Sequence, residues 1–185
     1  MEFPLKICCS LLAALCLMGS GHALTQPNIL EAGAQEQPAS QSAPAWEEDQ
    51  LEEYARQVFA LTNQLREEEG LPALAWQQDA AGAAGVRAEE IITSFSHTRP
   101  NGKSGLTALK EAGLSLRGGA GENLAAGQQN PQEVMEDWMA SPSHRENLLR
   151  DYYTSLGVAV RADENGRLYW VQLFLGEADS AAPQA

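Results

Sequence analysis

The sequence reads S-P-S-H-R-E-N-L-L from Ser141 to Leu149 and G-E-N-L-A from Gly121 to Ala125, shortly before the end of the chain. Serine followed by proline is a typical helix start, because the serine caps free backbone N–H groups and proline fits the first turn. One turn then carries the lone histidine His144, two charged residues and an asparagine. A short segment that only connects two elements does not need so many polar residues. We therefore expect these motifs to organise the fold and a site.

The segment that follows predicts a β-hairpin. Residues 155–161 and 167–175 are rich in β-branched and aromatic residues, and the sequence D-E-N-G at 163–166 separates them. An Asn-Gly pair between two such runs is a strong signal for a tight turn.

Hydrophobic periodicity predicts helices ahead of and between the motifs. The expected helices begin near residues 49, 77, 104, 131 and 142, and a buried strand is expected over 122–126. The expected inner face of the helix over 77–93 consists of Ala80, Ala81, Ala84, Ala88, Ile91 and Ile92. Helices packed against a small antiparallel sheet define an α+β sandwich.

The overall charge is strongly negative. The 185 residues include 12 Lys and Arg against 25 Asp and Glu, which gives a formal net charge of −13. Such a chain repels phosphate backbones and anionic headgroups, so we expect no nucleic-acid partner.

The first 23 residues have the pattern of a secretory signal peptide. One basic residue precedes an apolar run over 7–19, and small residues lead to a cleavage site after Ala23. All three cysteines, Cys8, Cys9 and Cys16, lie inside this segment, so cleavage leaves a cysteine-free protein. We expect export by a bacterium to the outside or the cell envelope, with no transmembrane span after cleavage; an uncleaved N-terminal anchor is the alternative.

Two further segments lack periodicity. Residues 24–48 are rich in Gln, Ala, Pro and Ser, and residues 178–185 form an Ala, Asp, Ser and Pro tail. We expect a flexible linker and a disordered tail on either side of one domain over 49–177.

The order of the motifs resembles that of the CAP superfamily. A leading helix ends in E-G-L-P-A-L-A-W (69–76), and then come F-S-H (95–97), G-E-N-L-A, Trp138 with S-P-S-H-R-E-N-L-L, and Y-W-V-Q-L-F (169–174). This order is similar to the SCP-like extracellular domain of cysteine-rich secretory, antigen 5 and pathogenesis-related proteins, particularly the cysteine-free bacterial branch. The resemblance covers residues 53–176. It implies an α-β-α sandwich with a cleft lined by histidine and glutamate, in proteins that are usually secreted.

The resemblance also implies a set of cleft residues. Eukaryotic members hold two histidines and two glutamates there, and some bind a divalent metal. His97 matches the first histidine and Glu122 matches the glutamate of the G-E-N motif. The second glutamate falls on Ser141 and the second histidine near Tyr152, so half of that set is missing. His144, from the bacterial pattern, completes a reduced set of His97, Glu122 and His144.

Three interpretations of this set stay open. Two imidazoles and a carboxylate suit a divalent metal such as Zn²⁺, with an open coordination position. Alternatively, Glu122 pairs with one histidine in a structural hydrogen-bond network. In the third interpretation the histidines are general acid and base catalysts, with Glu122 as the orienting group.

The other polar residues of the motifs have simpler explanations. Ser141 reads as a helix cap, and Asn123 and Asn147 as partners of loop backbone, with ligand contact as the alternative. Gln172 alternates with apolar neighbours, so it points into the cleft or is a satisfied polar group of the sheet.

We therefore expect a secreted binding or effector module, whose ligand is a metal ion, a lipid, a peptide or a cell-envelope component. An extracellular, peptidase-like hydrolase is the first alternative and a structural envelope protein with a vestigial cleft is the second. We expect a monomer.

Overall fold

The structure is a computed structural model that describes residues 46–177. The expected signal peptide (1–23), most of the expected linker and the expected tail (178–185) lie outside the described residues. The elements, in chain order, are α1 (Glu48–Glu68), β1 (Ala75–Trp76), α2 (Gln78–Thr93), α3 (Thr107–Glu111), β2 (Ala120–Ala126), α4 (Pro131–Ala140), α5 (Pro142–Leu148), β3 (Tyr153–Ala162) and β4 (Leu168–Gly176).

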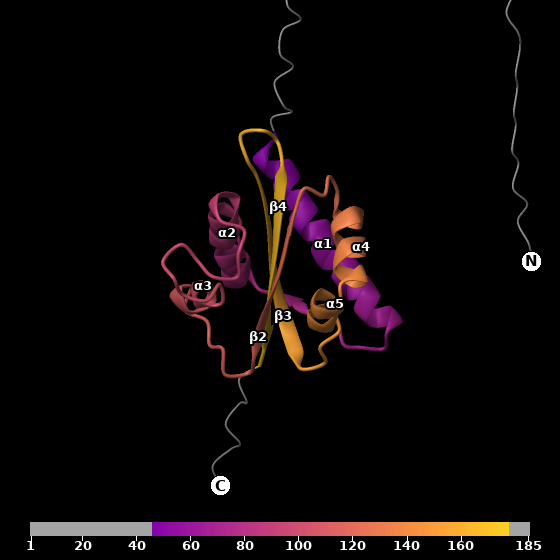
Figure 1. The fold of residues 1–185 in the computed structure, drawn as a ribbon. Coiled ribbons are helices and arrows are strands. Elements are labelled where there is room, and N and C mark those ends of the chain that lie inside the picture. The colour runs from indigo at the N-terminus through magenta and orange to yellow at the C-terminus, as the bar shows by residue number, and fades with distance from the viewer. Residues whose placement is uncertain (1–45, 178–185) are drawn as a thin grey trace, which may run out of the picture. The chain divides into compact units, whose positions relative to one another are not determined.

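The four strands form one sheet with the order β1-β3-β4-β2. The hairpin of β3 and β4 is antiparallel, as expected, and β2 adds to β4 in the antiparallel direction. Figure 1 shows α2 and α3 on one side of this sheet and α1, α4 and α5 on the other. The expected α-β-α sandwich is confirmed. The sheet differs from the expectation at one edge, where the two residues of β1 pair with β3 in parallel.

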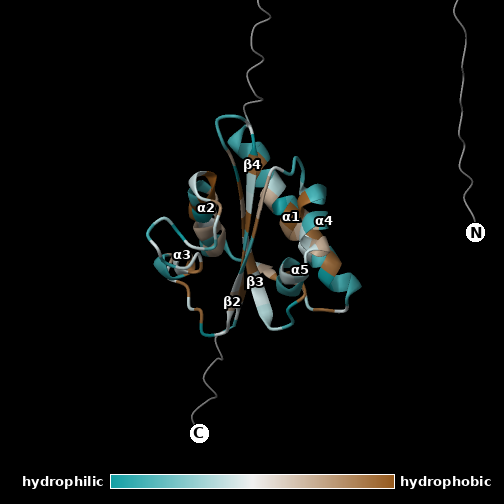
Figure 2. Ribbon diagram, viewed as in Figure 1, coloured by the Kyte–Doolittle hydropathy of each residue, from teal (hydrophilic) through white to brown (hydrophobic). Residues whose placement is uncertain are grey.

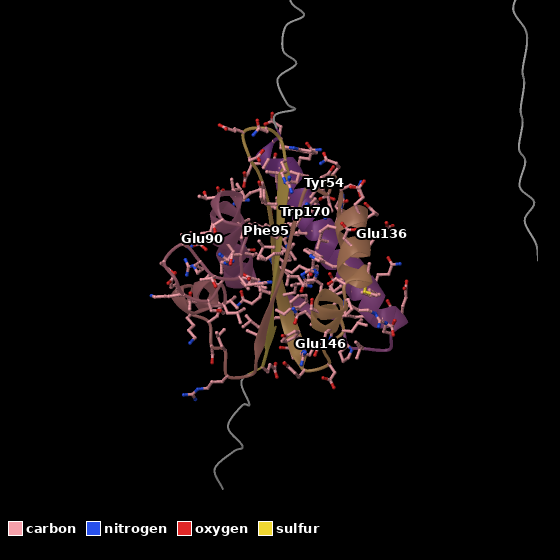
Figure 3. The ribbon with its side chains drawn as sticks, viewed as in Figure 1. Tyr54, Glu90, Phe95, Glu136, Glu146 and Trp170 are labelled. Atoms are coloured by element: carbon pink, nitrogen blue, oxygen red, sulfur yellow. The ribbon has the colours of Figure 1, made fainter. Side chains whose placement is uncertain are left out.

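Each face of the sheet has its own apolar core, and both cores draw on the apolar sides of the strands (Figure 2). Large fully buried side chains between the sheet, α1 and α4 are Trp138, Trp170, Phe174, Leu148, Leu156 and Leu168. Fully buried members between the sheet, α2 and α3 are Ala80, Ala84, Ala88, Ile91, Leu109, Val171 and Leu173. Aromatic stacking extends the first core outward, because Tyr54 lies over Trp170 with ring centroids 5.8 Å apart (Figure 3).

Small residues bring α2 very close to the sheet. Gly157 of β3 lies directly under the helix: a Cβ added there would lie 2.6 Å from the carbonyl oxygen of Ala80 and closer still to the next peptide nitrogen. The buried face of α2 is rotated from the expected one, since Ala83 and Arg87 are buried while Ala81 and Ile92 are partly exposed. The buried face therefore includes Arg87, whose side chain is fully buried.

The open edge of the sheet is β2, and side chains close it. The carbonyl groups of Glu122, Leu124 and Ala126 accept hydrogen bonds from Asn147 of α5, Trp138 of α4 and Arg167 of the hairpin, at 3.2 Å each. Residues two apart on a strand point the same way, so these three carbonyls belong to one outward-facing row.

A buried arginine on α1 fixes the end of α5. Arg66 is fully buried and donates to the carbonyl oxygens of Pro72, Leu148 and Arg150 at 2.9 Å each. A positive charge at the last carbonyls of a helix also suits the helix dipole. Arg66 therefore ties α5 and the chain after it to α1.

Residues 46–48, just ahead of the expected boundary at residue 49, already contact the domain or belong to α1. Helix α1 starts at Glu48, and Trp46 already packs against Tyr54, with its indole N–H bonded to the carbonyl oxygen of Gly166. None of the helices within residues 46–177 has both the length and the apolar composition needed to cross a bilayer.

Candidate functional site

A loop between α2 and α3 carries His97. Its two sides pair through a bridge between Thr98 and Ser104, and the backbone N–H of Gly105 donates to the carbonyl oxygen of His97 at 2.7 Å. A guanidinium N–H of Arg87 donates to the carbonyl oxygen of Ser96 at 2.6 Å. The backbone on both sides of His97 is therefore tied down.

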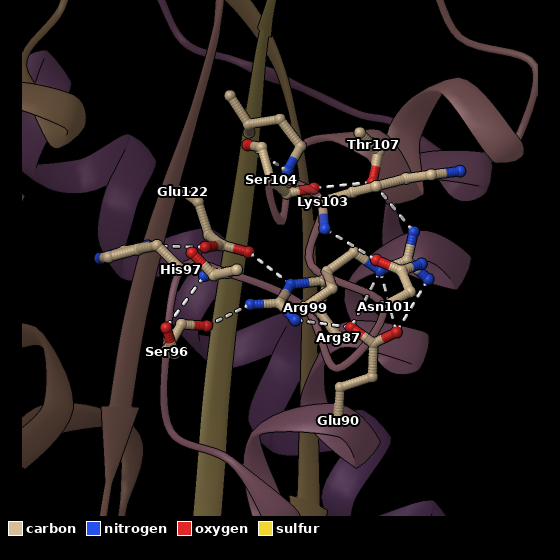
Figure 4. A network of polar contacts seen from close by, with 12 residues as sticks. Arg87, Glu90, Ser96, His97, Arg99, Asn101, Lys103, Ser104, Thr107 and Glu122 are labelled. Carbon is tan, nitrogen blue, oxygen red and sulfur yellow. Dashed lines mark hydrogen bonds and ion pairs between the residues drawn. The ribbon is translucent and has the colours of Figure 1, made fainter.

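Glu122 on β2 receives the ring of His97. Nδ1 of His97 lies 2.6 Å from Oε2 of Glu122, while Nε of Arg87 donates to Oε1 at 2.7 Å (Figure 4). The Glu122 side chain is 4% exposed, but the His97 side chain is 63% exposed. One edge of the imidazole is thus fixed in the protein and the rest faces solvent.

His144 reaches the same end of β2 from the opposite face of the sheet. It lies on α5, and its backbone carbonyl oxygen accepts a hydrogen bond from Asn123 of β2. Asn147, one turn later, donates both to the carbonyl oxygen of Glu122 and to Oδ1 of Asn123. The amides of β2 and α5 therefore hold the helix that carries His144 beside the strand that carries Glu122.

The pKa values of the two histidines move in opposite directions. The hydrogen bond to Glu122 raises the pKa of His97 above 6.5, although partial burial opposes the shift. Burial lowers the pKa of His144, and the nearby positive charge of His97 lowers it further. The site can therefore hold one protonated and one neutral imidazole at the same pH.

A chain of alternating charges extends from Glu122 away from β2. Arg87 binds Glu90, and Arg99 binds both Glu90 and Glu111, with contacts of 2.6–2.8 Å (Figure 4). Burial of Glu90 works against its ionisation, but the hydrogen bonds from the two guanidiniums hold its pKa below the usual range. The chain links α2, α3 and the His97 loop into one electrostatic unit.

The structure also gives the contacts of two other expected site residues, Gln172 and Ser141. Gln172 is fully buried and donates to the hydroxyl of Thr62 on α1, while its carbonyl oxygen accepts from Asn123. Of the two alternatives for Gln172, the structure therefore shows the second, a polar group of the sheet whose hydrogen bonds are satisfied within the protein. Ser141 occupies the N-cap position of α5, as expected, but its hydroxyl makes no capping bond and lies 3.4 Å from that of Ser143.

Two residues close to the site were missed in the sequence. One is Arg87, which is the ion-pair partner of Glu122. The signal in the sequence was that a charged residue stands on the alanine-rich inner face of a helix. Tyr153 is 3% exposed, and its hydroxyl lies near Gly121 and Asn147. Burial raises the pKa of Tyr153 to about 12. No sequence signal set this tyrosine apart from its neighbour Tyr152, which is 47% exposed.

The side chains do not fit a metal centre as they lie. Across residues 46–177, no group of three His, Cys, Asp or Glu side chains is arranged to hold a metal ion. Both oxygens of Glu122 are already engaged, by Arg87 and by His97. Metal binding by His97, Glu122 and His144 stays a prediction.

A cavity of about 900 Å³ lies elsewhere. Its lining includes Pro142, Arg145, Glu146 and Leu149 of α5 and its C-terminal end. These residues are three or four apart and share one face of the helix, whereas His144 and Asn147 lie on the other. The cavity and the histidine site are therefore separated by α5.

Comparison with known proteins places this domain in a family. The model of the cysteine-rich secretory protein (CAP) family matches residues 59–174. The chain belongs to the cysteine-rich secretory protein family, as the order of its motifs predicted.

Its relatives include bacterial proteins. The chain is 32% identical over 158 residues to the uncharacterized protein YkwD of Bacillus subtilis (strain 168), covering 80% of this chain and 60% of YkwD. It is 34% identical over 122 residues to the uncharacterized membrane protein YlbC of the same strain, covering 65% of this chain and 34% of YlbC. The chain thus spans less than two thirds of either relative.

Solved structures share the fold. An extracellular protein containing an SCP domain from Bacillus anthracis superimposes with a TM-score of 0.64 at 28% identity, over 73% of this chain and 45% of that one. An outer surface protein from Borrelia burgdorferi superimposes with a TM-score of 0.60 at 21% identity, over 68% of this chain and 93% of that one. At that lower identity the likeness shows the fold alone.

Proposed function

We propose that the protein is exported by a bacterium and acts as a binding module, in which His97 and His144 form the contact site for a cell-envelope component and Glu122 holds the ring of His97 from behind. The signal-peptide pattern over residues 1–23 supports export. The similar Bacillus anthracis protein is described as extracellular and the Borrelia burgdorferi protein as an outer surface protein, which agrees with this location.

The observation that carries the proposal is the state of the His97 ring. Its Nδ1 is held by a buried carboxylate, while 63% of the side chain remains exposed. A purely structural histidine gains nothing from this exposure, whereas a ligand contact needs a ring that is both fixed and accessible. His144 adds a second imidazole at the same end of β2.

Binding is favoured over covalent catalysis by the surroundings of the histidines. The serine hydroxyls of the S-P-S-H motif lie beside each other, and neither makes a hydrogen bond to an imidazole within the described residues. A serine nucleophile needs a base within hydrogen-bond reach. A lipid or a peptide of the envelope suits the exposed rings better than a metal does, because the carboxylate is already engaged.

Cosedimentation with isolated bacterial cell walls tests the proposal, with lipid vesicles as a second arm. We expect the full chain to sediment with one of these, and His97→Ala with His144→Ala to weaken binding by about tenfold or more, equivalent to about 1.4 kcal/mol. Arg145→Ala, on the opposite face of α5, is the matched control and should bind normally. Equal binding by all variants, or no binding by the native chain, would leave the site as a structural network.

A hydrolase is the second candidate, because the pKa values of the two histidines are displaced in opposite directions. Such a pair supplies an acid and a base at one pH. In this case His97 would donate a proton to the leaving group and His144 would accept one from water. Peptide release from cell-wall fragments, with a bell-shaped pH profile that loses one limb in each alanine variant, is the expected result. Absence of any release would reject this candidate.

A further inference from the structure

We propose that Arg87 and Glu122 are a positioning pair that acts on a ligand only through His97, whose Nε2 is the atom presented outward. The inference rests on the proposed function in one respect, namely that the site contacts a ligand. Its structural content concerns three side chains and is independent of what that ligand is.

Arg87 holds both Glu122 and the loop that carries His97. Its Nε donates to Oε1 of Glu122 at 2.7 Å, and a second N–H donates to the carbonyl oxygen of Ser96 at 2.6 Å. The third contact, to Glu90 at 2.6 Å, fixes the guanidinium to its own helix. A fully buried guanidinium with three directed contacts is a rigid template, because its planar donors leave little freedom of orientation.

Glu122 is enclosed and cannot turn toward a ligand. A Cβ added at Gly105 would lie 2.7 Å from Oε2, closer still to Oε1, and 2.8 Å from Nε of Arg87. The backbone of the His97 loop therefore covers the carboxylate directly. Glycine is required at position 105 by this contact, since its φ is not in the left-handed region.

The geometry fixes how His97 carries its proton. An ionised carboxylate only accepts hydrogen bonds, so Nδ1 of His97 must be the donor to Oε2. The neutral ring is then the Nδ1–H form, and Nε2 remains free on the exposed side. Glu122 thus determines which ring atom faces a ligand while making no contact with the ligand itself.

Arg99, in the same chain of alternating charges, offers a matched control for a purely structural role of Arg87. Arg99 is also buried, binds the same Glu90, and belongs to the same loop as His97, but it does not touch Glu122. Removing either arginine breaks buried ion pairs and lowers stability. Of the two, only the removal of Arg87 should change which ring nitrogen of His97 carries the proton.

Nitrogen-15 NMR of the imidazoles tests the inference without a ligand. The full chain is used with His22→Gln in every sample, so that only His97 and His144 contribute, at a pH where both rings are neutral. We expect native His97 to show the shifts of the Nδ1–H form. In Arg87→Met and Glu122→Gln the shifts should move toward those of the Nε2–H form, with partial restoration in Arg87→Lys and no change in Arg99→Met.

Two results would overturn the inference. One is that His97 keeps the nitrogen-15 shifts of the Nδ1–H form in the folded Arg87→Lys, Arg87→Met and Glu122→Gln proteins. The other is that these shifts change in Arg99→Met as much as they do in Arg87→Met. If Arg87→Met fails to fold, Arg87→Lys and Glu122→Gln still decide the matter. Because the readout needs no ligand, the inference can fail while envelope binding succeeds, and binding can fail while the expected ring form is found.

Discussion

His97 and His144 show how one strand end gives two identical side chains different properties. The ring of His97 gains a carboxylate partner, whereas the ring of His144 loses water without gaining one. Sequence alone identified both histidines and Glu122. It did not separate their roles, because the difference depends on Arg87 and on the loop that encloses the carboxylate.

Opposite pKa shifts predict a stability maximum near the ordinary histidine pKa of 6.5. The raised pKa of His97 means that its contribution is complete below 6.5 and is lost as the pH rises through its folded value. The lowered pKa of His144 gives a contribution that is complete above 6.5 and is lost as the pH falls through its folded value. Each contribution should be under about 1 kcal/mol, since solvent screens these partly exposed groups.

Urea denaturation across the pH range measures this effect as a difference between native and variant proteins. His97→Ala should flatten the alkaline side of the profile and His144→Ala the acid side. Parallel profiles for the native protein and His97→Ala above pH 6.5 would contradict the prediction.

Helix α5 is held in place by polar side chains of neighbouring elements, although it is only seven residues long. Asn147 and Asn123 connect it to β2, and Arg66 donates to the carbonyl oxygen of its last residue, Leu148. Isolated helices of this length are unstable in water, so the position of His144 depends on these contacts.

Arg66→Met should destabilise the protein by about 3 kcal/mol, because three buried or part-buried carbonyl groups lose a charged donor. We also expect larger displacement of α5, visible as faster amide exchange of Leu148 than in the native protein. Arg56→Met on the exposed part of α1 is the control. A loss below about 1 kcal/mol would show that α5 is held mainly by its apolar contacts.

Gln172→Met should cost about 1–3 kcal/mol, since Asn123 and Thr62 each lose a buried partner. The exposed Gln64, bonded only to Glu68, provides the control. Gln64→Met should change the free energy of unfolding by less than about 0.5 kcal/mol. Equal effects of the two substitutions, measured by urea denaturation, would refute a structural role for Gln172.

The whole domain depends on how closely α2 approaches the sheet. Gly157→Ala places a methyl group against the backbone of Ala80 and Ala81, which cannot rotate away. We expect the free energy of unfolding to fall by more than about 2 kcal/mol. Gly82→Ala on the open side of α2 should instead raise it by up to about 1 kcal/mol, because alanine favours the helix. Thermal and urea unfolding of the two variants provide the comparison, and a neutral Gly157→Ala would contradict it.

The three-layer fold was predictable because the elements other than the two-residue strand β1 carry local signals. Periodic apolar residues marked α1 and α2, Asn130 with Pro131 marked the start of α4, and the Asn-Gly turn marked the hairpin. No local signal identified the partners of Arg66 and Arg87, although Arg87 stands out as a charged residue on the alanine-rich inner face of α2. Two of the three carbonyl partners of Arg66 lie more than 80 residues away, and Glu122 lies 35 residues from Arg87. Burial of a charge can be explained only once those partners are in place.

The closed edge of β2 bears on how copies of this protein meet. Open strand edges invite pairing with the strands of other molecules and begin aggregation. Here Asn147, Trp138 and Arg167 occupy the outward carbonyls of β2, and the strand at the opposite edge, β1, is only two residues long. The outward carbonyls of β2 and the two residues of β1 are therefore poor templates for strand addition. The net charge of −13 adds repulsion between copies of the chain, so these copies should remain dispersed at high concentration.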